Sequence, residues 1–291
     1  MGRVIISASR RTDMPKFFAE WFMDRIRSGS CRYSNPFNPS QVLEVSLRPE
    51  DVDVIVFWSK DPEPMIGHLR ELERMGFRYY FHFTLNGYPA FLEPGVPPIE
   101  QVVATFRRLS DAVSPDRVIW RYDPIVLTSV TDVSYHKRRF AELARALDGW
   151  TKRVVISLLD DYPSSRARLE HLVDHGIRVE RPRSAGDPVT ADLLATIAQL
   201  AAGSGMEISA CAEAWDLEAL GIRRGKCIDD EYIARVFGVR VPSRKDPGQR
   251  AECRCVVSRD IGVYGTCRHG CLYCYASGHK AAPAAALRHF H

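Results

Sequence analysis

Six short runs of β-branched and aromatic residues, separated by longer amphipathic stretches, constrain most strongly what this chain can fold into. The runs occupy residues 4–8, 53–58, 79–85, 118–122, 154–159 and 206–210. Each run is apolar almost throughout, which suits strands buried on both faces of a sheet. The stretches between them place apolar residues three and four positions apart, as helices that cover a sheet do. Repeated strand–helix alternation predicts an α/β fold built on a parallel sheet.

The clearest helical stripes run from Phe18 to Ile26 and from Ile99 to Val113. Further helices are expected near residues 64–75, 134–147, 164–175 and 190–203. This number of strand–helix units in about 250 residues favours a TIM-like parallel barrel, complete or incomplete, over an open doubly wound sheet. No Gly-rich phosphate loop follows the first run, which weakens the dinucleotide-binding alternative.

Two segments depart from the alternation. Residues 31–50, with the string Asn-Pro-Phe-Asn-Pro, are expected to form an inserted loop or hairpin near the mouth of the barrel. After residue 211 the pattern fades. We therefore predict a barrel over residues 1–238 and a cysteine-rich extension over 239–291 that covers the mouth and packs on the barrel as one structural unit.

The small excess of basic residues lies in the extension. The whole chain has 40 Lys and Arg against 36 Asp and Glu, whereas residues 241–291 hold eight against three. Such a tail could favour an anionic partner, although a solvated segment is the simpler explanation. No apolar run approaches the roughly 20 residues of a membrane span, and the first residues lack the apolar region of a signal peptide. We therefore expect a cytoplasmic protein without membrane contact.

Cysteine usage indicates a metal. Five of the eight cysteines fall between residues 253 and 274. Because the cytosol keeps thiols reduced, a disulfide framework is not expected there, and clustered cysteines serve metals instead. Cys267, Cys271 and Cys274 have the spacing C-x3-C-x2-C. Three thiolates on one tight loop can hold three corners of a 4Fe–4S cluster and leave the fourth iron open to another ligand.

These three cysteines resemble the cluster triad of the radical S-adenosylmethionine superfamily, and Tyr273 matches the aromatic residue usual before its last cysteine. The fuller string Cys-x-His-Gly-Cys-x-Tyr-Cys-Tyr-Ala is similar to the spore photoproduct lyase branch, as is the Arg-x-Asp-Pro element at 121–124. In ordinary members the triad follows the first barrel strand, whereas here it lies near residue 270. That order is similar to an uncharacterised bacterial family, a domain of unknown function with the triad at its C terminus. Other strings that match this family lie at 7–13, 35–39, 56–60, 120–124 and 225–229.

The resemblance to the superfamily implies an enzyme that binds S-adenosylmethionine at the open iron and generates a 5′-deoxyadenosyl radical. It also implies a flavodoxin- or ferredoxin-type electron donor. The substrate is left open as a small molecule or a nucleotide-like compound. The lyase-like string and the basic tail suggest nucleic-acid repair or modification as one option.

Polar side chains at the ends of the predicted strands, where barrel enzymes place their chemistry, supply the remaining candidates. Arginine forks match carboxylates and phosphates, and carboxylates can hold ribose hydroxyls or a substrate amine. The candidate catalytic residues are Arg10, Arg11, Arg121 and Asp123. The candidate cofactor-binding residues are Ser9, Lys60, Asn86, Glu213 and Tyr273. Each could instead be a helix cap or a structural ion pair.

Two other interpretations of the cysteines stay open. Cys253 or Cys255 could complete a closed cluster, which would make the chain an electron-transfer protein, and a zinc site would make it a zinc-stapled binding protein. The cysteines outside the triad also offer a second metal site, for an auxiliary cluster or for zinc. Its candidate ligands are Cys211, Cys227, Cys253 and Cys255. Cys211 could equally be an ordinary buried residue, and Cys31 is expected to be structural or incidental.

Overall fold

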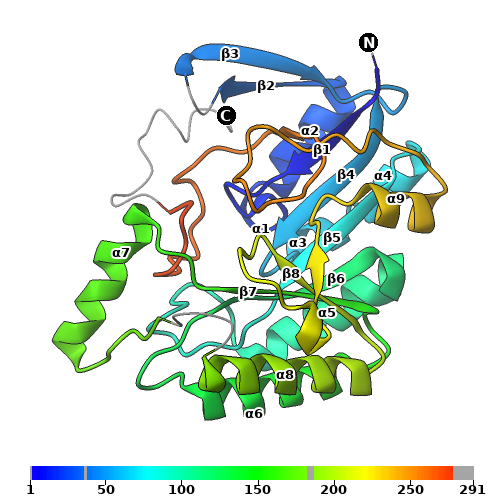
Figure 1. Ribbon diagram of the computed structural model, residues 1–291. Helices are drawn as coiled ribbons and strands as arrows, with labels where there is room; N and C mark the ends of the chain where they lie inside the picture. Colours follow the sequence, from blue (N-terminus) through cyan, green and yellow to red (C-terminus); the bar gives the residue numbers. More distant parts are fainter. Residues whose placement is uncertain (1, 36–37, 182–186, 278–291) are drawn as a thin grey trace.

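A parallel sheet organises the computed structural model, which describes residues 2–35, 38–181 and 187–277 (Figure 1). Its eight strands pair in the order β10-β1-β4-β5-β6-β7-β8-β9, and every pair is parallel. The strands are β1 (Val4–Ala8), β4 (Val52–Ser59), β5 (Tyr79–Thr84), β6 (Val118–Ile125), β7 (Arg153–Leu158), β8 (Glu207–Cys211), β9 (Arg223–Gly225) and β10 (Arg259–Asp260). All six predicted runs are strands, which confirms the α/β fold and the parallel sheet.

The helices follow the predicted stripes closely. They are α1 (Met14–Phe17), α2 (Ala19–Ser28), α3 (Glu63–Ile66), α4 (Leu69–Arg74), α5 (Ile99–Val113), α6 (Val133–Ala146), α7 (Pro163–Glu170), α8 (Pro188–Gly203) and α9 (Asp230–Phe237). The stretch predicted near 64–75 divides into α3 and α4, because the chain turns at Gly67 and His68. The stretch near 164–175 ends in a 3-10 turn from His171 to His175. Within the described residues, no helix combines the length and the apolar character that a membrane crossing needs.

Both faces of the sheet are buried, which explains why the predicted runs are apolar throughout. On one face, aromatic side chains such as Phe57, Phe81 and Trp120 pack into the core formed with α2, α5, α6 and α8. On the other face, alternate strand residues, including Val54 and Tyr80, pack against α9 and the chain that follows it. The Tyr80 hydroxyl donates to the carbonyl of Cys227 at 2.8 Å. Residues 227–256 therefore cover the face that a closed barrel would bury in its interior.

Closure of the sheet into a barrel is not found. Among the described residues, the edge strands β9 and β10 each pair with one neighbour, β8 and β1, and not with each other. Both edge strands are short, and neither was predicted, because two or three residues are too few to show periodicity.

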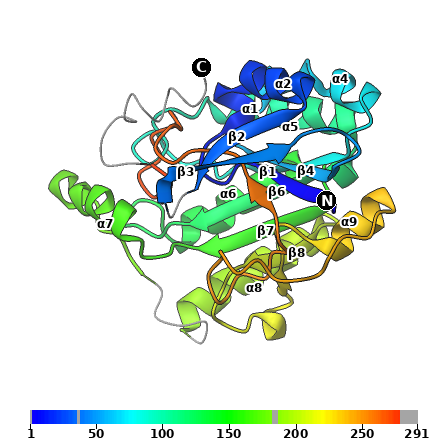
Figure 2. The same ribbon diagram turned by 90° about the horizontal axis from the view of Figure 1, so that it is seen from above.

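The insertion predicted at 31–50 is a hairpin. Strands β2 (Ser30–Asn35) and β3 (Asn38–Ser46) pair antiparallel to form a separate two-stranded sheet. The hairpin connects α2 to β4, so its base lies at the amino-terminal end of the parallel sheet (Figures 1 and 2). Farther along the hairpin, Tyr33 lies within electrostatic range of Arg11 and Arg259. Cys31 is buried in β2, and burial raises the pKa of its thiol to about 12.

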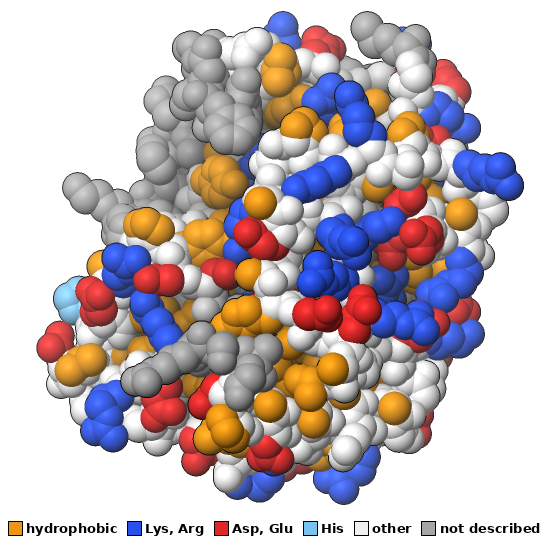
Figure 3. Space-filling model, viewed as in Figure 1, with side chains coloured by type: hydrophobic (Ala, Val, Ile, Leu, Met, Phe, Trp, Pro, Cys, Tyr) orange, Lys and Arg blue, Asp and Glu red, His pale blue; other side chains and the backbone are white. Residues whose placement is uncertain are grey.

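Charged side chains of both signs are interspersed over the face seen in Figure 1, and no extended patch of one sign dominates it (Figure 3). Part of the predicted basic tail lies outside the described residues, since the description ends at residue 277.

One buried carboxylate docks the chain after α9 onto the first strand. Asp260, in β10, accepts hydrogen bonds from the Ser7 hydroxyl at 2.8 Å, the Ser9 hydroxyl at 2.5 Å and the Arg10 amide at 2.9 Å. The amide of Gly262 donates to the same carboxylate at 3.0 Å. A buried carboxylate is stable only when donors surround it in this way, so Asp260 fixes where β10 lies along β1.

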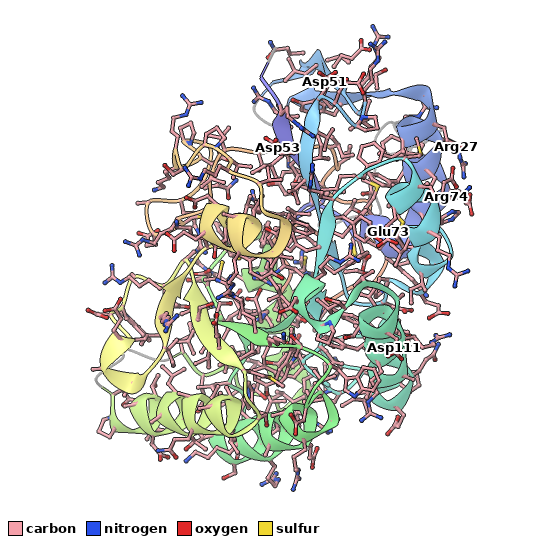
Figure 4. The ribbon with its side chains drawn as sticks, turned by 90° about the vertical axis from the view of Figure 1, so that its right-hand side faces the viewer. Arg27, Asp51, Asp53, Glu73, Arg74 and Asp111 are labelled. Carbon is pink, nitrogen blue, oxygen red and sulfur yellow. The ribbon has the colours of Figure 1, made fainter. Side chains whose placement is uncertain are left out.

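Replacing Asp260 with Ala should lower the free energy of unfolding by about 3–5 kcal/mol, because buried donors from β1 lose a charged acceptor. Urea unfolding followed by circular dichroism measures the change. Asp111→Ala is the control, since Asp111 is exposed on α5 on the side of the molecule covered by helices (Figure 4). A loss below about 1 kcal/mol for Asp260→Ala would contradict this role of the carboxylate.

His136 in α6 should make the protein less stable in acid. Its Nε2 lies 3.1 Å from the carbonyl of Val126 and its Nδ1 lies 2.7 Å from the Tyr122 hydroxyl, an arrangement that a neutral ring satisfies. Burial lowers the pKa of His136 from 6.5 to about 4. The unfolded chain therefore binds a proton that the folded chain does not, and stability falls as pH drops from about 6.5 towards 4.

His136→Gln should flatten this pH dependence by up to about 3 kcal/mol between the two pH limits. The buried ring of His82, whose pKa burial also lowers, should keep part of the slope in the variant. Urea midpoints at several pH values measure the effect, with the exposed His175→Gln as control. Equal slopes for the wild type and His136→Gln would refute the explanation.

Candidate functional site

The loop with the three clustered cysteines lies over the carboxyl ends of β1, β4 and β5. The amide of Gly265 donates to the carbonyl of Ala276 at 2.9 Å, which closes the loop at its base. Gly265 and Gly270 both have positive φ, 76° and 68°, so the backbone turns where a side chain would be strained. The amide of Leu272 donates to the carbonyl of Leu92 at 3.0 Å, which attaches the loop to the connection after β5.

Asp13 joins this loop to the ends of two strands. Its carboxylate accepts hydrogen bonds from the Ser59 hydroxyl at 2.7 Å and the Lys60 amide at 2.8 Å, both at the end of β4. The same carboxylate lies 2.8 Å from Nε2 of His269. The other ring nitrogen of His269 lies 3.0 Å from the carbonyl of Gly95. Both partners are acceptors, so the ring makes both bonds only when both of its nitrogens carry a proton.

The three thiols of the loop lie within electrostatic range of one another. Cys271 is buried, whereas Cys267 and Cys274 are partly exposed. Burial, reinforced by the charge of Asp13, raises the pKa of Cys267 to about 12. Burial raises the pKa of Cys271 as well, and the nearby ammonium of Lys60 opposes that rise. A cation bound among the three sulfurs would supply the charge that the thiolates need.

Tyr273 lies between the second and third cysteines of the loop, and several buried polar side chains hold it in place. Its hydroxyl donates to Glu93, and Nδ2 of Asn86 donates to that hydroxyl at 3.1 Å. Lys60 Nζ lies 2.8 Å from Glu93 Oε1 and 5.5 Å from the centre of the Tyr273 ring. Tyr273 is therefore held by residues from the ends of β4 and β5, beside Cys271.

Helix α7 holds the other side of the loop. The guanidinium of Arg168 donates to the carbonyls of Leu272 at 3.2 Å and Ser277 at 3.1 Å, and to the carbonyl of Cys274. Figures 1 and 2 both show the last described segment next to α7, which projects from the side of the sheet.

The other four cysteines, apart from Cys31, form a second group. The Sγ atoms of Cys211, at the end of β8, and Cys227, just after β9, are 2.9 Å apart. The thiol of Cys255 lies near those of Cys227 and Cys253. Arg121 Nη1 donates to Sγ of Cys227 at 2.8 Å. The three cysteines of the loop and this second group of four therefore lie at the same end of the sheet.

Two of the candidate catalytic residues form a buried ion pair. Nε of Arg121 donates to Oδ2 of Asp123 at 2.9 Å, and Ser157 donates to the same carboxylate. Burial opposes the charge of Asp123, but Arg121 and Ser157 outweigh it and lower the pKa of Asp123. The Arg10 and Arg121 guanidiniums lie 5.4 Å and 5.2 Å from the centre of the same ring, that of Trp58. Arg10, Arg121 and Asp123 are therefore brought together at the ends of β1, β4 and β6.

The remaining strand-end candidates are engaged in bonds of their own. Ser9 bonds to Asp260, and Asn86 donates to the carbonyl of Asp123 at 3.1 Å as well as to Tyr273. Glu213 accepts from the Leu158 amide at 2.7 Å, and burial raises its pKa to about 7. The guanidinium of Arg11 lies over the Tyr264 ring at 5.4 Å, at the base of the cysteine loop, and donates to the carbonyl of Gly262 at 3.3 Å.

Several residues that shape the site were not identified as site residues from sequence. Glu93 lies seven positions beyond Asn86, outside the strand-end pattern that guided the choice of candidates. Arg168 lies on a helix, and Asp260 in a two-residue strand. His269 was visible in the motif, but its bond to Asp13 spans 256 positions and leaves no local signal.

As the side chains stand, no group of three or more His, Cys, Asp or Glu within the described residues has the geometry of a metal site. The comparison with known families matches residues 5–276 to the Domain of unknown function (DUF1848). The chain belongs to the DUF1848 family. The match spans the sheet and the cysteine loop together, so both are features of one DUF1848 domain. A search of curated proteins found no match.

Replacing Arg168 with Ala should loosen the DUF1848 cysteine loop without unfolding the sheet, because three loop carbonyls lose their donor. Hydrogen exchange of peptides covering residues 264–277 should accelerate at least several-fold, while exchange in β5 and β6 should be unchanged. Arg166→Ala is the matched control, since Arg166 lies on the same helix but binds Asp161. Equal exchange rates in Arg168→Ala and Arg166→Ala would contradict the role of Arg168 in holding the loop.

Proposed function

We propose that this DUF1848 protein is a radical S-adenosylmethionine enzyme whose 4Fe–4S cluster is bound by Cys267, Cys271 and Cys274. The observation that carries the proposal is the C-x3-C-x2-C loop itself, held over the carboxyl ends of consecutive parallel strands by Asp13, Glu93 and Arg168. That end of a parallel sheet is where α/β enzymes bind ligands. We also propose that the open sheet is an incomplete TIM-like barrel, whose inner face residues 227–256 cover.

The donor set fits a cluster with one open iron. The three thiols lie near one another, and the four cysteines of the second group contact each other and Arg121. Cys253 and Cys255 are thus engaged elsewhere, which disfavours them as a fourth cluster ligand. Both ring nitrogens of His269 already have partners, which disfavours it as a zinc ligand. When bound and reduced, such a cluster cleaves S-adenosylmethionine to methionine and a 5′-deoxyadenosyl radical that takes hydrogen from a substrate.

The residues around the loop would position the reactants and exclude water. Tyr273 is buried beside Cys271 and shields that side of the loop. Lys60 places a positive charge near Cys271, which favours electron-rich ligands at the loop. Nη2 of Arg10 is buried and has no hydrogen-bond partner among the described residues. Because guanidinium donors match carboxylates and phosphates, Arg10 is the best candidate in the described site to bind an anionic group of a small or nucleotide-like substrate.

The proposed enzyme needs a one-electron donor, and a flavodoxin- or ferredoxin-type protein would serve. The partly exposed thiols of Cys267 and Cys274 put the cluster near the surface, within reach of such a partner. Nucleic acid is a less supported substrate, since the face in Figure 3 carries interspersed charges of both signs.

The anaerobically reconstituted and reduced protein should convert added S-adenosylmethionine to 5′-deoxyadenosine, measured by chromatography. Cys271→Ala should abolish the product, because the cluster loses a ligand from the buried centre of the loop. Cys31→Ala should retain it, since Cys31 lies in the separate hairpin sheet. A perturbed electron paramagnetic resonance spectrum on addition of S-adenosylmethionine tests binding even where turnover needs the substrate.

An electron-transfer role would predict a full, reducible cluster whose spectrum S-adenosylmethionine does not change. A colourless protein without iron after reconstitution would contradict both iron-based interpretations and leave zinc.

A further inference from the structure

Four cysteines from three separate chain segments lie together near the carboxyl ends of β8 and β9. Cys211 ends β8, Cys227 follows β9, and Cys253 and Cys255 lie in the chain after α9. The thiols of Cys211 and Cys227 are in contact, and those of Cys253 and Cys255 lie within electrostatic range of this pair. Cys227, Cys253 and Cys255 are buried, and Cys211 is partly exposed. In a core, one cysteine is ordinary, but four gathered in one place need an explanation.

The surroundings of this group suit negative sulfur. Arg121 Nη1 donates to Sγ of Cys227 at 2.8 Å, and the amide of Ile228 donates to Sγ of Cys255 at 3.4 Å. Arg10 lies within electrostatic range of Cys227 and Cys255. Four thiolates around a divalent cation carry a net charge of −2, and the guanidiniums of Arg10 and Arg121 place positive charge beside them. These neighbours favour thiolates over neutral thiols, and a bound cation would stabilise the thiolates further.

We propose that Cys211, Cys227, Cys253 and Cys255 bind one zinc ion in a closed, structural site. Zinc–sulfur bonds of about 2.3 Å put the sulfurs of a tetrahedral site about 3.8 Å apart. The Sγ atoms of Cys211 and Cys227 are 2.9 Å apart, so this pair must separate by about 0.9 Å to reach that spacing. A 4Fe–4S cube would force the four sulfurs much farther apart. One mononuclear ion therefore fits the spacing better than a second cluster.

The site would attach the chain after α9 to the sheet. A backbone hydrogen bond already joins the segment of Cys227 to the segment of Cys253 and Cys255, since the Val256 amide donates to the carbonyl of Ile228 at 3.1 Å. Zinc would add a bond to the end of β8 through Cys211. It would also fix Arg121, which bonds both to Cys227 and to Asp123. This inference does not depend on the proposed radical chemistry, because the two groups of cysteines share no ligand.

Elemental analysis of the protein purified without chelators tests the proposal. We expect one zinc per chain in the wild type, in Cys31→Ala, and in the triple variant Cys267→Ala/Cys271→Ala/Cys274→Ala. Cys255→Ala and Cys227→Ala should lose it. Because those two variants could fail to fold, the full-length wild type should also be titrated with cobalt after zinc removal. The intense visible absorption of a tetrahedral cobalt–thiolate site, displaced by one equivalent of zinc, is expected.

Three results would overturn the proposal. Zinc retained by Cys255→Ala would place the ion elsewhere. Iron and sulfide retained by the triple variant would mean that the second group holds a cluster. A wild type without zinc whose peptide map shows a Cys211–Cys227 disulfide would mean that this pair is a redox couple. A wild type that binds zinc but no cluster would refute the proposed function and leave this inference intact.

Discussion

The position of the cysteine loop depends on one buried carboxylate. Asp13 receives hydrogen bonds from the amide of Lys16 in α1, from the end of β4, and from the ring of His269. A carboxylate removed from water is costly unless donors surround it, and His269 supplies one of those donors from 256 positions away. Lifting the loop from the sheet would therefore leave a buried charge short of a partner. This cost, together with the apolar packing of Cys271 and Tyr273 against Tyr88 and Leu92, keeps the three thiols at the carboxyl ends of the strands.

A buried ion pair lies near each of the two groups of cysteines. Lys60 is paired with Glu93, and Arg121 with Asp123, and all four side chains are largely shielded from water. Arg10 differs, since its Nη2 atom is buried without a partner among the described residues. A buried donor without a partner destabilises the folded protein. Functional sites tolerate this cost where a bound ligand supplies the missing acceptor. Of the charged side chains Lys60, Arg121 and Arg10, Arg10 is thus the one with a buried donor still available to an acceptor.

The sequence predicted the sheet well because the evidence for it is local. Strands buried on both faces are apolar along their whole length, and the cysteine spacing in 267–274 is visible without any structure. The edge strands β9 and β10 could not be predicted, since two or three residues have no period. Nor could the loop supports Glu93 and Arg168, whose partners are 180 and 104 positions away. A TIM-like barrel, complete or incomplete, was inferred from the number of strand–helix units, which does not reveal whether the sheet closes or that residues 227–256 cover one of its faces.

The pairing of β10 with β1 also governs the order in which the protein can be completed. Ser7 and Asp260 are neighbours in the sheet but are separated by 253 positions, so ribosomes make the partner of the first strand long after the strand itself. Until then the outer edge of β1 has free amide and carbonyl groups, which is a hazard for misassembly. The same late segment that covers this edge continues into the cysteine loop a few residues later. A nascent chain therefore protects the edge of its first strand and completes its cysteine loop almost simultaneously.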